Sequence, residues 1–367
     1  MKNKWNAIDC WMVALGATFF SVGLFAPRFA LRNAGSVCTN THKNEPRRIA
    51  SVEVIIPAYL ESSCIGSRVE ELRRQTQGSV VPVAICVVAS DQETAAAAAV
   101  AGARVQHHSR SGKAAAINAA VSASRADLIV LTDANCSFAP ENWLSLVIDS
   151  FCCAALICGR KAELGSLERL SRRYAEFDLT ADSREVVALP FAVGEALAFR
   201  RSDFVSIPET TLVDDLAICL SFIRRRLPVG VAPKWAVSEP AANSAQQWER
   251  RVRMATGVMR EVSPQIAHLL HFPQGRVLLV CKYWRLTIGN AAYWAMVVGL
   301  FLRFRKGWQW FAMGTLAIVP GVLFKVGLLG RSLISQLVVP LALQAVPPVA
   351  VVRLMRRPSG VWRKEPR

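Results

Sequence analysis

The chain has 367 residues, 52% of them hydrophobic, and a formal net charge of +17 at pH 7. A chain of this length can bury a sizeable core and hold one catalytic domain with additional elements. The positive charge would suit a nucleic-acid-binding protein, but many basic residues flank apolar runs and neither an aromatic-interleaved basic stretch nor zinc-finger spacing is present, so we expect membrane contact and no nucleic-acid partner.

The first apolar run predicts a membrane anchor. From Ala7 to Leu31 the only charged residues are Asp9 and Arg28, and the run is long enough to cross a hydrocarbon core of about 30 Å. We therefore expect a transmembrane anchor in residues 1–32; a cleavable signal peptide is the alternative. A basic linker follows at residues 33–49, and the positive-inside rule places the next domain in the cytoplasm.

Residues 50–273 have the composition of an α/β domain. Short β-branched runs alternate with Ala-rich, helix-like segments, which is typical of buried parallel strands joined by crossover helices. The expected strands are Val52–Pro57, Val83–Ala89, Leu128–Thr132 and Leu156–Cys158, and the expected helices are Thr94–Ala103 and Lys113–Ala123.

Carboxylates follow the first two expected strands. Glu61 comes shortly after the first strand and Asp91 directly after the second. Because open parallel sheets bind ligands at the carboxyl ends of their strands, both are candidates for contacting a nucleotide. For Glu61 the alternative is a polar loop residue, and for Asp91 it is a helix N-cap.

A Gly-Lys pair opens the second expected helix. Gly112 permits a tight turn, and Lys113 adds a cation to the free amides of the helix start. Together they suit a diphosphate, although the spacing is not that of a Walker A loop. A solvated lysine is the alternative for Lys113.

The third expected strand leads into Asp133 and Asn135. Side-chain oxygens at such a strand exit suit a hard cation, so we expect Mg²⁺ or Mn²⁺ to be held there together with substrate phosphates.

Two further segments carry candidate chemistry. Asp214 and Asp215 stand at the start of a helix-like run, where one could cap the helix and the other act as a base; two capping residues are the alternative. The basic segment Gln246–Arg253 could clamp a diphosphate or an acceptor, or contact anionic headgroups.

Apolar character returns in residues 274–352, followed by a basic tail at 353–367. Three candidate spans are Leu286–Leu302, Trp308–Leu329 and Ile334–Val352. The charge distribution leaves their number open, because Gly275–Arg285 could instead lie in a membrane interface.

In this order the motifs resemble the membrane-bound family 2 glycosyltransferases, relatives of which include cellulose, chitin and hyaluronan synthases and ceramide glucosyltransferases. The resemblance covers about residues 50 to 260. Its motifs are Pro57–Glu61, Asp91, Gly112-Lys113 with Asn118, Asp133-x-Asn135, Gly194, Asp214-Asp215 and Gln247-x-x-Arg250.

This resemblance implies a GT-A fold, with a Rossmann-like nucleotide half joined to an acceptor half, flanked by transmembrane helices. It also implies roles for the residues. Glu61 and Asp91 would contact the uridine end of the donor, and Lys113 would contact the nucleotide. Asp133 and Asn135 would hold the metal, and Asp215, beside Asp214, would be the catalytic base. The residues facing the acceptor or the diphosphate would be Gln247, Arg250 and Arg251, and Glu195 would bond sugar hydroxyls.

Three positions depart from the family pattern, and one of them, Asp214 in place of the usual Glu, is chemically near-equivalent. Asn135 replaces a second Asp, which makes the metal site one charge poorer, and Arg251 stands where processive synthases have a Trp. We therefore expect addition of one or a few sugars.

The expected function is inverting transfer from a UDP-sugar to a membrane lipid or lipid-linked glycan, by an integral protein of a bacterial inner or plasma membrane with a cytoplasmic catalytic domain. A processive polysaccharide synthase and a catalytically silent nucleotide-binding membrane subunit are the alternatives.

Overall fold

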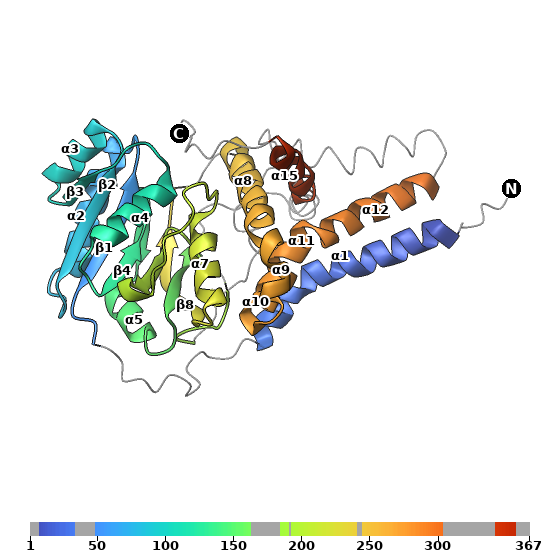
Figure 1. Cartoon of the computed structure of the whole chain (residues 1–367), viewed down its shortest axis with the longest axis horizontal. Helices are drawn as coiled ribbons and strands as arrows, with labels where there is room; N and C mark the ends of the chain where they lie inside the picture. Colours follow the sequence, from blue (N-terminus) through green and yellow to red (C-terminus); the bar gives the residue numbers. More distant parts are fainter. Residues whose placement is uncertain are drawn as a thin grey trace.

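A computed structural model describes residues 7–33, 48–162, 184–190, 192–240, 244–303 and 342–356. The chain forms a sheet-containing body and a helical part, which lie beside one another (Figure 1). The helical part includes both the first described helix and the last one, so segments far apart in the sequence meet there.

The body is built on one mixed sheet of eight strands in the order β3-β2-β1-β4-β7-β6-β8-β5. Neighbours among the first four strands of this order are parallel; β7 is antiparallel to β4 and β6, β8 is parallel to β6, and β5 is antiparallel to β8. The strands are β1 Val52–Ala58, β2 Val83–Ala89, β3 Arg104–His107, β4 Leu128–Leu131, β5 Ser137–Ala139, β6 Leu156–Ala162, β7 Leu197–Arg200 and β8 Val229–Ser238.

Helices cover both faces of this sheet. Every residue of β1 is buried, and its side chains alternate between two hydrophobic clusters, with Ile55 in one and Val54 and Ile56 in the other. This double burial explains the continuous apolar run that predicted the strand. The Ile55 cluster includes α4 (Lys113–Ala123) and α7 (Asp214–Arg224), and the opposite cluster includes α2 (Ser62–Thr76), α3 (Gln92–Val100) and α5 (Trp143–Ser150).

The predicted α/β class is confirmed. The strand at Val83–Ala89 and the helix at Lys113–Ala123 have the predicted bounds, and the strand expected at Leu156–Cys158 continues to Ala162. Four strands, β3, β5, β7 and β8, were not predicted. The sheet thus continues beyond the expected parallel strands through β7, which is antiparallel to both of its neighbours, β4 and β6.

The helical part follows β8. Its elements are α8 Ser244–Val262, α9 Ile266–Leu269, α10 Pro273–Leu278, the π-helical turn η3 Leu279–Tyr283, α11 Trp284–Leu286, α12 Ile288–Arg303 and α15 Val346–Met355, with α1 Ala7–Asn33 from the start of the chain. Helix α15 packs against α8 in a small hydrophobic cluster that includes Trp248 and Val346.

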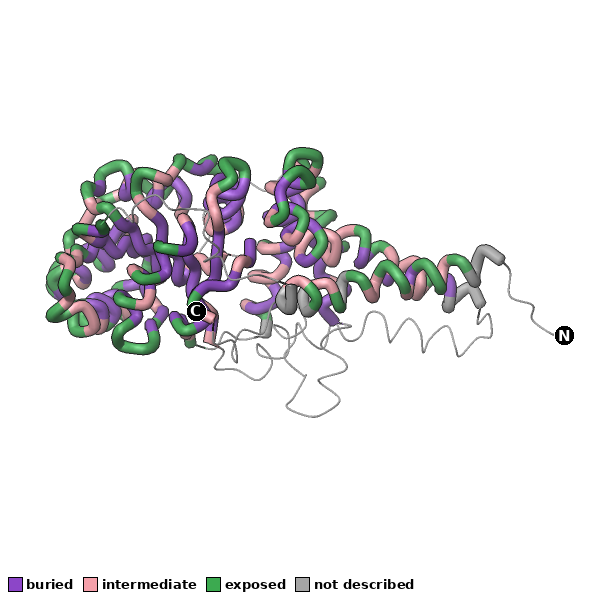
Figure 2. Tube along the Cα trace, turned by 90° about the horizontal axis from the view of Figure 1, so that it is seen from below, coloured by how far each residue is buried: buried purple, intermediate pink, exposed green. Residues whose placement is uncertain are grey.

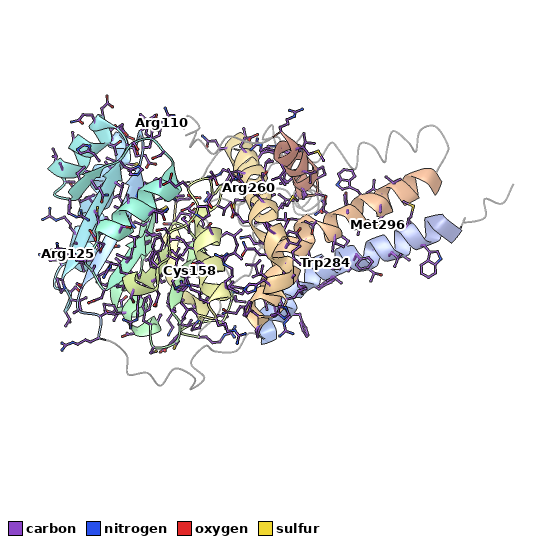
Figure 3. The ribbon with its side chains drawn as sticks, in the orientation of Figure 1. Arg110, Arg125, Cys158, Arg260, Trp284 and Met296 are labelled. Atoms are coloured by element: carbon purple, nitrogen blue, oxygen red, sulfur yellow. The ribbon has the colours of Figure 1, made fainter. Side chains whose placement is uncertain are left out.

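Helices α1 and α12 lie side by side and extend away from the body (Figures 1 and 2). A Cβ atom added at Gly16 would lie 2.7 Å from the Ala292 carbonyl oxygen and from the Met296 Cβ, so only a glycine permits this approach. The Trp284 indole N–H donates to the Phe19 carbonyl at 3.0 Å. Figure 3 labels Trp284 and Met296 along this helix pair.

The expected membrane topology is corrected. No helix within the described residues combines the length and apolar composition that crossing a bilayer requires. Helix α12 has 16 residues, a rise of about 24 Å against a hydrocarbon core of about 30 Å. Helix α1 is longer, but it includes Asp9, Pro27 and Arg28 and packs on α12.

The anchor predicted in residues 1–32 and the location as an integral membrane protein with a cytoplasmic catalytic domain are therefore wrong for the described helices. The expected span Trp308–Leu329, residues 334–341 of the third span, the linker residues 34–47 and the tail residues 357–367 lie outside the described residues.

Candidate active site

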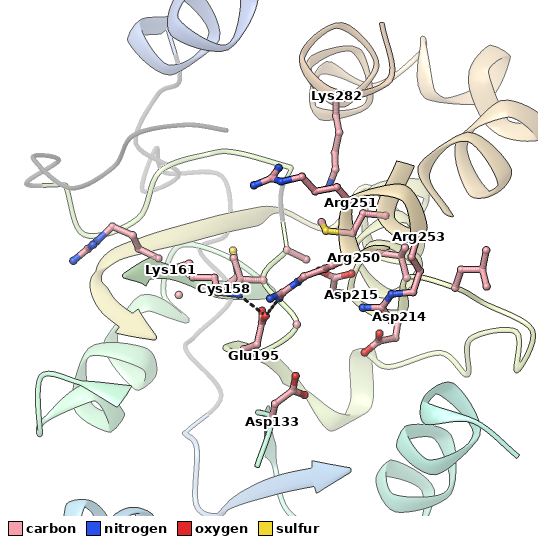
Figure 4. A pocket seen from close by; sticks show the side chains of 18 of the residues that line it. Asp133, Cys158, Lys161, Glu195, Asp214, Asp215, Arg250, Arg251, Arg253 and Lys282 are labelled. Carbon is pink, nitrogen blue, oxygen red and sulfur yellow. Dashed lines mark hydrogen bonds and ion pairs between the residues drawn. The ribbon is translucent and has the colours of Figure 1, made fainter. Parts of the chain in front are cut away.

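A pocket of about 190 Å³ lies where the sheet meets the helical part (Figure 4). Ligand sites usually have about 300–1,000 Å³, so this cavity is sized for part of a nucleotide-sugar. Charged side chains dominate its lining: Lys113, Asp133, Arg160, Lys161, Glu195, Asp214, Asp215, Arg250, Arg251, Arg253 and Lys282.

Strand direction explains why these residues meet. Strands β4 and β6 run in the same direction because each is antiparallel to β7. Asp133 follows β4, Lys161 lies near the end of β6, and Glu195 precedes β7. All three therefore reach the same edge of the sheet, which is where open α/β sheets bind ligands.

One cation joins two carboxylates in what we call the lysine bridge, formed by Lys113, Asp133 and Asp214. The Lys113 ammonium lies 2.7 Å from the Asp133 carboxylate and 3.5 Å from that of Asp214. Gly112, with a φ of 112°, allows the turn that places Lys113 at the start of α4. Burial disfavours the charge, but the two carboxylates outweigh it and raise the pKa of Lys113 above its ordinary value.

Asp215 is the partly buried carboxylate at the first turn of α7. Its Oδ1 accepts a hydrogen bond of 2.8 Å from the Leu216 backbone N–H, and a Cβ added at Gly194 would lie 3.4 Å from the Asp215 Cβ. Burial, and next the charge of Asp214, raise the pKa of Asp215 to about 6, while Lys282 opposes this. A carboxylate with this pKa is suited to accepting a proton near neutral pH.

A second charged group, the ion quartet, consists of Lys161, Glu195, Glu239 and Arg250. The Lys161 ammonium lies 2.7 Å from Glu195 and also contacts Glu239. Arg250 contacts both carboxylates through different guanidinium nitrogens. Burial opposes ionisation of Glu195, but Lys161 and Arg250 outweigh it and hold its pKa well below the usual range. Figure 4 shows Glu195 between the two cations.

The two carboxylates predicted to contact the nucleotide lie outside this pocket lining. The two oxygens of Asp91 accept from the backbone N–H groups of Thr94, at 2.9 Å, and Leu60, at 2.7 Å. Asp91 thus caps α3 and ties it to the loop after β1, as the N-cap alternative anticipated. Glu61 is buried beside Thr94, whose hydroxyl accepts from its backbone N–H at 2.9 Å. Their nucleotide contacts remain predictions.

The expected metal site is only partly assembled. Asp133 lines the pocket, and Asn135 is not part of that lining. Within the described residues no three His, Cys, Asp or Glu side chains form a metal-binding group. One carboxylate still fits Mg²⁺ or Mn²⁺, because such ions are often held by one or two carboxylates plus substrate phosphates.

Helix α8 brings the predicted acceptor-side residues together. Gln247, Arg250, Arg251 and Met254 recur at helical spacing and all line the pocket. Asn118, part of the family pattern, instead bonds the backbone of Ile207. Its side-chain amide N–H donates to the Ile207 carbonyl at 2.8 Å, and its amide oxygen accepts from the Ile207 N–H at 3.0 Å.

Four charged residues of the site were missed from the sequence: Arg160, Lys161, Glu239 and Lys282. Glu239 follows β8, an unpredicted strand, and Lys282 lies in a segment interpreted as a membrane interface. The available signal for Glu239 was a carboxylate directly after the segment Val229–Ser238, which forms β8.

Comparison with known proteins agrees with the fold. Residues 53–206 match the model of glycosyl transferase family 2. No curated protein sequence matches the chain. A mannosyltransferase from Pyrobaculum calidifontis, in complex with GDP-mannose and Mn²⁺, has a similar structure, with a TM-score of 0.67 and 17% identity over 95% of this chain and 99% of the other.

Two further solved structures are more distant. Mannosyl-3-phosphoglycerate synthase from Rubrobacter xylanophilus has a TM-score of 0.43 and 18% identity, over 69% of this chain and 85% of that one. Glucosyl-3-phosphoglycerate synthase from Mycobacterium tuberculosis, with Mg²⁺ and UDP, has a TM-score of 0.40 and 16% identity, over 57% and 79%.

The fold is the GT-A fold of glycosyltransferases, and residues 53–206 match a glycosyltransferase family model. These two findings indicate that the chain is a glycosyltransferase.

Proposed function

We propose that the chain is an inverting glycosyltransferase that moves a sugar from a nucleoside diphosphate-sugar to an acceptor hydroxyl, with Asp215 as the base. The observation that carries this proposal is the position of Asp215. Its carboxylate lines a pocket that is rich in Lys and Arg side chains, at the edge of the sheet where the parallel strands end, and its pKa is raised to about 6.

In the proposed reaction the acceptor oxygen attacks C1 of the sugar from the side opposite the leaving group. The C1–O bond to the diphosphate breaks, and its electron pair stays on the diphosphate oxygen. The acceptor proton passes to the Asp215 carboxylate. The reaction needs no further reactant. The site has to stabilise the negative charge that develops on the leaving diphosphate.

The donor end is proposed at the lysine bridge. Lys113 starts α4, so its ammonium and the free backbone N–H groups of the helix start favour phosphate oxygens. Asp133 would hold Mg²⁺ or Mn²⁺, which would neutralise charge on the diphosphate. A UDP-sugar is the expected donor, and the GDP-mannose bound by the similar mannosyltransferase makes a GDP-sugar the second candidate.

The acceptor is proposed to be a lipid or a lipid-linked glycan. Large apolar side chains of α1 are exposed, among them Trp11, Phe25 and Phe29 at 63%, 58% and 70% of their full area. Such a row supports contact with an acceptor that has an apolar part.

The test is turnover of labelled UDP- and GDP-sugars by the full chain with Mn²⁺ or Mg²⁺, in the presence of lipid acceptors. Asp215→Asn should reduce turnover at least about 100-fold while nucleotide binding persists. Asp149→Asn, on α5 away from the pocket, is the matched control and should keep full activity. Unchanged turnover in the Asp215 variant would refute its role as the base.

A further inference from the structure

The connection that carries Asp133 is bonded at both ends to one helix. Residues 132–136 join β4 to β5. On α2 three polar side chains recur at helical spacing, so they lie on one face of the helix: Arg68, Glu71 and Gln75. All three form hydrogen bonds with the connection or with β5, and we call them the α2 clamp.

Arg68 holds the start of the connection. Its guanidinium donates to the Thr132 hydroxyl at 3.1 Å, and Thr132 directly precedes Asp133. The same guanidinium lies 3.0 Å from the Glu71 carboxylate and over the Phe138 ring, 4.3 Å from its centroid. The Arg68 side chain is 1% exposed, so all three contacts are shielded from water.

Glu71 and Gln75 hold the end of the connection. The Ser137 hydroxyl donates to the Glu71 carboxylate at 3.2 Å. The Gln75 amide N–H donates to the Phe138 carbonyl at 3.0 Å, and the Gln75 amide oxygen accepts from the Trp143 indole N–H at 3.1 Å. The two ends of the connection are therefore fixed to the same face of α2.

The buried guanidinium is better suited to positioning than to stabilising the fold. Taking a guanidinium out of water is costly, and a buried ion pair often stabilises a protein no more than well-packed apolar residues would. Burial lowers the pKa of Arg68, and the charges of Glu71 and Asp133 oppose this, so Arg68 lies near the proposed metal ligand. Within the described part of the chain the buried Arg68 Nε has no hydrogen-bond partner, which reduces its contribution to stability further.

We infer that Arg68 is a positioning residue for the proposed metal ligand. Through Thr132 and Glu71 it fixes the backbone that carries Asp133, so that the carboxylate is held in one orientation for Mg²⁺ or Mn²⁺; Lys113 contacts the carboxylate itself. The inference rests on the proposed function, in which Asp133 holds the metal. Arg68 is not part of the pocket lining, so it acts through the connection, and groups that orient a metal ligand typically change metal affinity about 10–100-fold when they are removed.

The test compares two substitutions of Thr132 in the full chain. Thr132→Val has nearly the same shape but lacks the hydroxyl that accepts from Arg68, whereas Thr132→Ser keeps it. Mn²⁺ affinity is measured by electron paramagnetic resonance in the presence of UDP or GDP. We expect Thr132→Val to weaken Mn²⁺ binding about tenfold and Thr132→Ser to change it less than about twofold.

A second set of variants tests Arg68 directly. Arg68→Met should weaken Mn²⁺ binding about tenfold or more. Arg68→Lys should restore only part of the affinity, because an ammonium lacks the planar fork that bonds Thr132 and Glu71 at once. Arg74→Met is the matched control: Arg74 lies on the same helix with its side chain 68% exposed, and Mn²⁺ affinity should not change.

Two further measurements separate positioning from a general disturbance of the pocket. In Thr132→Val the affinity for the nucleotide without Mn²⁺ should change less than about twofold, and turnover should recover at high Mn²⁺ concentration, because the KM for the metal is altered and the chemical step is not. An unchanged melting temperature shows that the variant is folded.

The outcomes distinguish the inference from the proposed function. If Asp133→Asn leaves Mn²⁺ affinity unchanged, the proposed metal role of Asp133 fails, and the inference fails with it. If Asp133→Asn weakens Mn²⁺ binding but Thr132→Val does not, the metal role stands and the inference is overturned. The inference is also overturned if Thr132→Val weakens nucleotide binding without Mn²⁺ as much as it weakens Mn²⁺ binding.

Discussion

The ion quartet allows a sharp test of how the pocket is stabilised. Lys161→Met removes one of its two cations, so that Glu195 and Glu239 share only Arg250. The side chains of Lys161, Glu195 and Glu239 are 4%, 9% and 11% exposed, and water therefore compensates little for the lost partner.

Breaking a buried ion pair usually costs about 3–5 kcal/mol. Since Arg250 still contacts both carboxylates, we expect the loss for Lys161→Met to be lower, about 2–4 kcal/mol in the free energy of unfolding. Glu239→Gln alone leaves two cations on Glu195 and should cost about 1–3 kcal/mol.

The double variant decides the matter. Lys161→Met with Glu239→Gln leaves a balanced pair, Arg250 with Glu195, so it should be more stable than the sum of the two single losses predicts, by about 1 kcal/mol or more. Urea unfolding at pH 7.5, followed by circular dichroism, measures all four proteins. Strictly additive losses would refute the reasoning, because they would mean that the two residues contribute independently.

The remaining predictions concern pH and metal. Because Asp215 has to be ionised to accept a proton and its pKa is about 6, kcat/KM should fall about tenfold for each pH step below 6; a flat profile between pH 5 and 8 would contradict its role. The same raised pKa means that this group's contribution to stability is fully present below the ordinary value of 3.8 and is lost as the pH rises through 6, so Asp215→Asn should raise the urea midpoint at pH 8. Chelation of divalent ions should abolish donor turnover. Asp133→Asn should weaken Mn²⁺ binding about tenfold or more, measured by electron paramagnetic resonance of Mn²⁺ in the presence of UDP or GDP. Unchanged Mn²⁺ affinity would exclude Asp133 as a ligand.

Local patterns made much of the parallel half of the sheet predictable. Strand β2 is a pure apolar run followed by the capping residue Asp91, and α4 is Ala-rich and opens after a glycine. Strand β8 was missed because Pro233 and Lys234 interrupt its apolar run, and central strands rarely contain proline. A register shift between Gly159 and Arg160 of β6 accommodates this interruption.

The site was less predictable because its charges pair over long distances in the sequence. Lys161 and Glu239 are separated by 78 positions and meet only because β6 and β8 are neighbours. Lys113, Asp133 and Asp214 were each identified as site residues, but their mutual contact was not foreseen. The membrane topology was predicted wrongly for a related reason. Hydrophobic segments that pack against each other, as α1 and α12 do, have the same sequence pattern as segments that face lipid.

The close contact at Gly16 has a consequence for synthesis of the chain. Helix α1 ends at Asn33, and its partner α12 ends at Arg303, so α1 is made long before the surface on which it packs. At about 5–20 residues per second the delay is about 15–50 seconds. During that time its apolar side chains have no partner within the chain, and we expect nascent chains arrested before α12 to recruit chaperones or aggregate, whereas chains arrested well beyond Arg303 should not.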